Sequence, residues 1–77
     1  MEKHDVCGQF GRRVRALRHK RGLTQEKLGE LAELDRTFVN QVEAGKRNVT
    51  LATIHRLADA LDVDPGELVT EARSADR

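Results

Sequence analysis

Residues 24–46 read TQEKLGELAELDRTFVNQVEAGK. Apolar residues recur in this stretch at helical spacing, and they predict one helix from Gln25 to about Ala32 and a second from Arg36 to about Glu43. Only a few residues remain between the two helices, and so short a connection forces a large angle between their axes. The stretch therefore predicts two short helices that cross rather than lie antiparallel.

Capping residues mark where these two helices begin and end. Thr24 is a good N-cap for the first helix, and the carboxylate of Asp35 is expected to cap the second and to complement its dipole. Gly45 is expected to stop the second helix. Gly29 permits the close approach of the following helix, whereas Glu33 in the turn would cost roughly 1 kcal/mol if its φ is positive. The residues expected to face inward are Leu28, Leu31, Val39 and Val42.

Three further helices are predicted around this pair. One runs from about Gln9 to Lys20, and another runs from Leu51 to Leu61 behind Thr50 as its N-cap. The last starts in Asp64–Glu67, where an N-cap aspartate, a proline at the first helical position and a capping-box glutamate coincide. The core residues expected on these helices are Phe10, Val14, Leu17, Leu51, Ile54, Leu57, Ala58, Leu61, Leu68, Val69 and Ala72.

These elements add up to an all-α protein, a compact bundle of five short helices. The 77 residues are enough for one domain at most. We expect a single domain over residues 1–77, with its core at about 9–72 and the crossed helix pair, a helix-turn-helix, over 24–44.

Charge is distributed unevenly along the chain. The net charge is only +1, but residues 1–50 hold 11 basic and 7 acidic side chains, whereas residues 51–77 hold 3 basic and 6 acidic ones. Between Gln9 and Gly22 there are six basic residues and no acidic one. A surface that serves solubility alone mixes the two signs. The first half of the chain is therefore expected to face a polyanion.

Three segments together resemble a known family. Thr24–Leu28, Leu34–Val39 and Val42–Asn48 look like the Cro/lambda-repressor type of helix-turn-helix, the XRE family, and the resemblance covers roughly Phe10 to Leu68. Asp-Arg-Thr-Phe at the second helix and the Lys-Arg-Asn-Val that follows it look most like the small controller proteins of restriction–modification systems. The resemblance implies a lambda-repressor-like fold and a sequence-specific, DNA-binding transcriptional regulator.

The resemblance also implies which residues touch double-stranded DNA. Arg36 offers a two-pronged donor that matches guanine O6 and N7 in the major groove, and Thr37 can also touch a thymine methyl. Gln25 stands at a helix start, where exposed amides suit a phosphate. The predicted base-reading residues are Arg36, Thr37, Asn40 and Gln41. The predicted backbone-binding residues are Gln25, Lys46, Arg47, Asn48 and Arg12.

Each of these roles has a simpler alternative. Arg36 could pair with a surface acid such as Glu33, a contact worth ~0–1 kcal/mol. Asn40 and Gln41 could be ordinary solvated positions, and Phe38 could either touch a thymine methyl or pack at the edge of the core. The basic residues of the first helix cannot all face one phosphate strand at helical spacing, so about half are expected to be plain solvated charges.

Catalytic and metal-binding groups are missing from the pattern. His4, His19 and His55 have no nucleophile or acid partner at an informative spacing, and Cys7 alone can form neither an internal disulfide nor a cysteine-based zinc site. Cys7 is expected to be a reduced thiol near the N-terminus, and the alternatives are a disulfide between two chains or a role in sensing oxidation. No apolar run exceeds two residues, which excludes a membrane helix. We expect a cytoplasmic protein that is not an enzyme and has no cofactor, metal or small-molecule ligand.

A homodimer is expected because one recognition helix reads too few base pairs to select a genomic site. Two copies on a palindrome would read half-sites about one helical turn, ~34 Å, apart. The predicted dimer interface is Leu61, Val63, Leu68 and Val69, unless these residues simply close the core of the monomer. Activation would need a surface for RNA polymerase, and the candidates are Glu26, Glu30 and Glu43. The competing function is a protein-binding adaptor or an antitoxin that neutralises a partner protein; the operator, and whether binding represses or activates, stay open.

Overall fold

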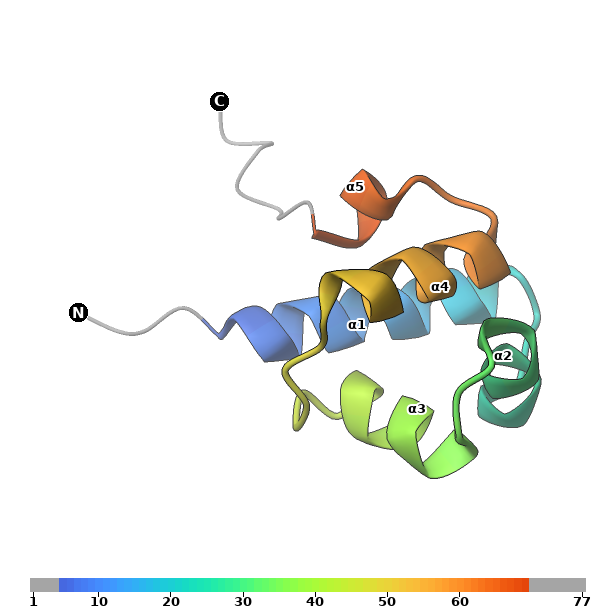
Figure 1. The fold of residues 1–77 in the computed structure, drawn as a ribbon, viewed down its shortest axis with the longest axis horizontal. Coiled ribbons are helices and arrows are strands. Elements are labelled where there is room, and N and C mark those ends of the chain that lie inside the picture. Colours follow the sequence, from blue (N-terminus) through green and yellow to red (C-terminus); the bar gives the residue numbers. More distant parts are fainter. Residues whose placement is uncertain (1–4, 70–77) are drawn as a thin grey trace.

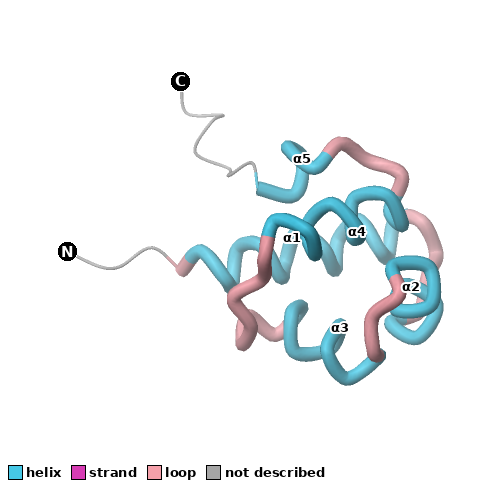
Figure 2. Tube along the Cα trace, viewed as in Figure 1, coloured by secondary structure: helices cyan, strands magenta, loops and turns pink. Residues whose placement is uncertain are grey.

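The computed structural model describes residues 5–69, which form five helices and no strand (Figures 1 and 2). The helices are α1 (Val6–Lys20), α2 (Gln25–Ala32), α3 (Arg36–Glu43), α4 (Leu51–Leu61) and α5 (Pro65–Val69). α1 packs against α3, α4 and α5, and α2 packs against α3 and α4. In Figure 1, α3 and α5 lie on opposite sides of the α1–α4 pair. The all-α expectation is confirmed, and no helix within the described part is both long and apolar enough to cross a membrane.

One cluster of aliphatic side chains holds the five helices together. The side chains with less than 2% exposure and the largest volumes are Val14, Leu28, Val39, Val42, Leu57, Leu61 and Leu68. All seven were expected in the core from helical spacing. Each contributes about 1.5–3 kcal/mol when it is removed from water, which is the main favourable term in the folding of so small a domain.

Three of the predicted core residues, Leu31, Leu51 and Val69, are on the surface instead, and Val69 is 57% exposed at the end of α5. Leu31 is 48% exposed because α2 turns Leu28, Gly29 and Ala32 inward, and the position just before Ala32 is rotated away by about 100°. Leu51 is 76% exposed because it is the first residue of α4 and precedes the turn that meets the core. Ala72 lies outside the described residues.

The N-terminal caps set the helix starts. Thr24 and Thr50 accept hydrogen bonds from the backbone N–H groups three residues later, at 2.9 and 3.1 Å, so both predicted caps are confirmed. Asp35 occupies the N-cap position of α3, but its side chain accepts no capping bond there, so that part of the prediction is wrong. α1 begins at Val6, three residues before the predicted start, because Asp5 caps it by accepting from the Gly8 N–H at 3.0 Å.

Four helices end on a residue with positive φ. Gly22 and Gly45 have φ values of 70° and 76°, as suits glycine, but Glu33 and Asp62 take the same conformation with φ values of 61° and 60°. After Glu33, the Leu34 N–H returns to the Gly29 carbonyl at 2.8 Å, the bond that closes this type of helix end. The turn between α2 and α3 therefore has the usual geometry, and Glu33 bears the steric cost of it.

Close backbone contacts fix the angle of α3. A Cβ on Gly29 would lie 2.5 Å from the carbonyl oxygen of Leu34, so the lack of a side chain there lets the turn fold back on α2. A Cβ on Gly11 would clash with the carbonyl oxygen of Val42, which means that α1 and α3 touch through their backbones. The close approach at Gly29 was expected from the sequence, whereas the contact at Gly11 was not.

Candidate nucleic-acid interface

The N-terminal tip of α3 is free on the surface. Arg36 and Thr37 are both exposed, and together with Gln25 and Asn40 they line one shallow depression between the starts of α2 and α3. Within residues 5–69, Arg36 has no carboxylate partner, so the simpler alternative of a pair with Glu33 is not realised. The fold thus brings together three of the predicted base-reading residues and one predicted phosphate-binding residue.

A buried ion pair contacts Gln25, one of the residues that line this depression. Glu43 accepts from Arg18 Nε at 2.6 Å and from Arg18 Nη2 at 3.0 Å, a two-pronged contact between α3 and α1. The two side chains are only 9% and 3% exposed, and Arg18 Nη1 also donates to the Leu23 carbonyl at 2.8 Å. No buried side-chain nitrogen or oxygen in the described part of the chain lacks a partner. The pair is therefore fully satisfied and joins α1, α3 and the loop before α2.

This pair corrects two sequence-based interpretations. Arg18 was counted within the basic run of the first helix, and Glu43 was a candidate for polymerase contact, but neither reaches the surface. Helical spacing carried a signal for both. Arg18 follows Val14 by four residues and Glu43 follows Val39 by four, so each charge lies on the apolar stripe of its helix.

Gln25 connects the ion pair to the surface. Its Nε2 donates to Glu43 Oε1 at 3.0 Å, and its Oε1 accepts from Asn40 Nδ2 at 3.3 Å. Asn40 is exposed, yet its amide is tied through Gln25 to the buried carboxylate. It is therefore not an ordinary solvated side chain.

Arg47 organises the other end of the α3 surface. Its Nε donates to Gln41 Oε1 at 2.8 Å, and its guanidinium carbon lies 5.2 Å from the centroid of the Phe38 ring. Phe38 is half-buried and packs against the core, which is one of the two roles predicted for it. Lys46 and Asn48 are exposed on either side of Arg47 in the loop after α3.

The remaining basic residues of α1 separate into different roles. Arg13 Nε donates to the Glu67 carbonyl at 2.8 Å and so ties α1 to α5. Arg12 is exposed, and its guanidinium is 3.9 Å from the carboxylate of Asp5, the N-cap residue of the same helix, rather than from a residue of α2 or α3.

The predicted dimer interface is only half available. Leu61 and Leu68 are 0% and 1% exposed in the single chain, so they close the monomer core and have no side-chain surface to offer a second copy. Val69 is 57% exposed and Val63 is half-buried. This outcome matches the simpler alternative for the two leucines.

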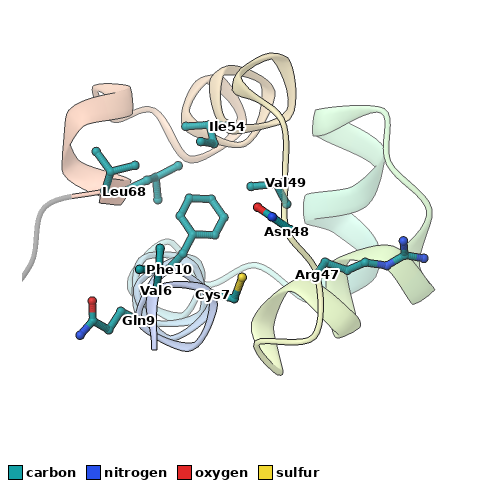
Figure 3. Close-up of a pocket in the computed structure, with 10 residues that line it drawn as sticks. Val6, Cys7, Gln9, Phe10, Arg47, Asn48, Val49, Ile54 and Leu68 are labelled. Carbon is teal, nitrogen blue, oxygen red and sulfur yellow. The ribbon is translucent and has the colours of Figure 1, made fainter. Parts of the chain in front are cut away.

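An apolar groove lies beside Val69. It is formed by the start of α1, the loop before α4, and parts of α4 and α5, and its apolar lining comes from Val6, Phe10, Val49, Ile54, Leu68 and Val69. Figure 3 shows the Phe10 ring in the middle of this group, while the Arg47 side chain extends away from it. Cys7, a free and half-buried thiol, lies at the edge. Within residues 5–69 no three His, Cys, Asp or Glu side chains are grouped to hold a metal ion.

Comparisons with known proteins agree with this geometry. A family model described as a helix-turn-helix domain matches residues 9–72. Control protein C.BamHI of Bacillus amyloliquefaciens is 41% identical over 61 residues, which cover 78% of this chain and 75% of that protein. Control protein C.SmaI of Serratia marcescens is 39% identical over 66 residues, covering 86% and 79%. The crystal structure of the restriction–modification controller protein C.AhdI from Aeromonas hydrophila superposes with a TM-score of 0.82 and 49% identity, covering 84% of this chain and 98% of that one.

Proposed function

The chain belongs to the helix-turn-helix family of DNA-binding transcription regulators, among them the restriction–modification controller proteins, and we propose that it reads a palindromic operator as a homodimer. The observation that carries this proposal is the free tip of α3. Arg36 and Thr37 lie exposed there next to Gln25 and Asn40, and Arg36 has no ionic partner among residues 5–69. A helix end with these donors fits the floor of the major groove.

The contacts to DNA divide into two kinds in this proposal. Arg36, Thr37, Asn40 and Gln41 read base edges along α3. Gln25, Lys46, Arg47, Asn48 and Arg12 bind phosphates, which fixes the register and carries little sequence information. Arg47 also holds Gln41, so it serves both purposes.

The dimer is proposed to form around Val69 and the apolar groove beside it. Val69 and Val6 are both more than half exposed, and they flank a groove whose other apolar residues are already part of the core. α5 lies on the opposite side of the molecule from α3, so a partner seated there leaves the DNA-reading tip uncovered (Figure 1). Exposed apolar surface of this kind is what association removes from water.

The setting of the protein follows from its relatives. We propose that it controls a restriction–modification locus, that it acts in the cytoplasm where bacterial DNA lies, and that it has no catalytic activity of its own. If it activates transcription, Glu26 and Glu30 on the exposed face of α2 are the remaining candidates for contact with RNA polymerase.

Selection of bound sequences from a random DNA pool tests this function directly. We expect an inverted repeat with half-site centres about 34 Å, or ~10 base pairs, apart, since two tips of α3 must enter successive major grooves on one face of the duplex. Enrichment of a single, unrepeated motif would contradict the dimer. Retention of all sequences equally would contradict sequence-specific regulation.

A further inference from the structure

A chain of hydrogen bonds runs from the core to the DNA-facing surface, and its first member fixes the direction of the rest. Glu43 is clamped by the Arg18 guanidinium through two bonds, and a carboxylate held in this way can only accept. Its side chain is only 3% exposed, so water does not supply a further hydrogen bond to it. Any third partner of Glu43 must therefore be a donor.

Gln25 is that donor, and this settles which way its amide faces. Its Nε2 lies 3.0 Å from Glu43 Oε1. The reverse orientation would set the Gln25 carbonyl oxygen against the carboxylate, two acceptors face to face beside a buried charge, which is costly in a low-dielectric setting. The Gln25 Oε1 atom is consequently turned toward Asn40.

Asn40 must then donate one of its two Nδ2 hydrogens to Gln25, which leaves its oxygen free to accept from another group. The bond from Asn40 Nδ2 to Gln25 Oε1 is 3.3 Å long, at the weak end of the range. Within residues 5–69 no donor reaches Asn40 Oδ1. The buried carboxylate thus sets the hydrogen-bonding sense of a side chain that it does not touch.

We infer that Asn40 presents its carbonyl oxygen to DNA and selects a base with an exocyclic amine in the major groove, adenine or cytosine, and that Arg18 and Glu43 are positioning residues for this preference. The inference rests on the proposed function and adds the chemical class of the base. Guanine O6 and N7 and thymine O4 are acceptors, so they would meet the Asn40 oxygen unfavourably.

The neighbouring residue supplies an internal contrast. Arg47 has only donors, and its Nε holds Gln41 Oε1 at 2.8 Å, so Gln41 keeps its Nε2 hydrogens for DNA. Asn40 and Gln41 are adjacent in the sequence but are fixed in opposite senses. An acidic replacement should therefore keep the base preference at Asn40 and remove it at Gln41.

The test is selection from a random DNA pool with the full chain and the variants Asn40→Ala, Asn40→Asp and Gln41→Glu. Asp and Glu can only accept, and the last two variants carry the same change in charge, so a general loss of affinity affects both alike. We expect Asn40→Ala to lose a preference of about fivefold or more at one base pair of each half-site. Asn40→Asp should keep adenine or cytosine there, whereas Gln41→Glu should lose the preference at its own base pair.

The variant Glu43→Gln tests the positioning role. A glutamine at this position can donate a hydrogen bond, so the side-chain amides of Gln25 and Asn40 can both rotate by about 180°. The preferred base at the Asn40 position should then shift toward guanine or thymine, while the preferences at the other base pairs stay unchanged. Thermal unfolding identifies the temperature at which this variant is folded for the selection. A folded Glu43→Gln with the wild-type preference would overturn the positioning role. If Glu43→Gln does not fold, Gln25→Ala decides, because it removes the link between the ion pair and Asn40, and an unchanged preference at the Asn40 base pair would then overturn the positioning role.

The inference and the proposed function fail in different ways. If Asn40→Asp behaves as Asn40→Ala, or shifts the preference to guanine or thymine, Asn40 does not present an acceptor and the inference is wrong. If the wild-type chain selects a palindrome but Asn40→Ala changes no base pair, the inference is again wrong while the function stands. Only a wild-type chain that selects no motif removes the function itself.

Discussion

Arg18 Nε lies 2.6 Å from Glu43 Oε2, and this contact joins two helices across a nearly dry part of the core. Removing one partner leaves the other charge buried and unpaired, which typically costs 3–5 kcal/mol, a large share of the stability of a small domain. We therefore expect Arg18→Met to lower the free energy of unfolding by about 3–5 kcal/mol, as measured by urea denaturation. The double variant Arg18→Met with Glu43→Leu should recover most of that loss, because no charge is then left buried. If Arg18→Met costs less than about 1 kcal/mol, the pair is not as desolvated as its geometry indicates.

The two members of this pair also mark the limit of the sequence analysis. Spacing and caps predicted the bounds of α2, α3 and α4, because Thr24, Thr50 and the aliphatic stripes act within one helix. The spacing of apolar residues within one helix does not show which other helix they pack against, because that depends on contacts between residues far apart in the sequence. Arg18 and Glu43 were for this reason treated as surface charges, although each lies on the buried side of its own helix.

In the candidate site, too, the individual residues could be predicted but the contacts between them could not. The resemblance pointed to Arg36, Thr37, Gln25 and Asn40 individually, and the fold brings these four into one depression. The hydrogen bonds that couple them could not be predicted, because Gln25 reaches Asn40 only through the exact angle between α2 and α3. That angle depends on the Gly11 and Gly29 contacts and on the positive φ of Glu33. The sequence predicted a steric cost at Glu33 only for the case that its φ is positive, and it did not predict the sign of φ.

Arg36→Ala tests the role of the helix tip. The side chain is exposed and has no ionic partner in the described part of the chain, so its removal should leave stability unchanged within about 0.5 kcal/mol. Binding to the cognate operator should weaken by about 1–3 kcal/mol, and the preference at one base pair of each half-site should relax. Lys46→Ala is the control, since loss of a phosphate contact weakens all sequences alike. Equal losses for Arg36→Ala on cognate and random DNA in a gel-shift series would remove its base-reading role.

Arg47→Ala should have a mixed effect, unlike Lys46→Ala. Loss of one phosphate contact is expected to reduce the salt dependence of log K by about 1. Because Arg47 also holds Gln41 at 2.8 Å, the preference at the Gln41 base pair should weaken as well. Titrations at several salt concentrations, on the operator and on a version changed at that base pair, separate the two effects. An Arg47→Ala variant with full discrimination at that pair would show that the Gln41 contact is incidental.

Glu33 and Asp62 offer a gain in stability. Both have φ near 60°, where a side chain costs about 1 kcal/mol or more and glycine costs little. Asp62 also adds a negative charge at the C-terminal end of α4, where the helix dipole disfavours it. We expect Asp62→Gly to raise the free energy of unfolding by about 0.5–1 kcal/mol, which in a domain of this size is a few degrees in Tm.

Glu30→Gly is the matched control for Asp62→Gly. Glu30 lies within α2 in ordinary helical conformation, so glycine there should destabilise by about 1 kcal/mol. If calorimetry shows that both glycine variants lower Tm, the cost of a positive φ at position 62 is smaller than the flexibility that glycine adds to the unfolded chain.

Val69→Asp tests the proposed dimer surface. Val69 is 57% exposed, so a charge at this position should leave the monomer core intact, yet it would be buried without a partner if a second copy covers it. We expect sedimentation at micromolar concentration to shift from dimer toward monomer, and affinity for the full palindrome to fall far more than affinity for a half-site, because the second copy no longer supplies its share of the binding energy. Leu31→Asp is the control, since Leu31 is 48% exposed on α2 and lies outside the groove. Dissociation by Leu31→Asp but not by Val69→Asp would move the interface to α2, and dissociation by neither would mean that the copies meet through other residues than Val69.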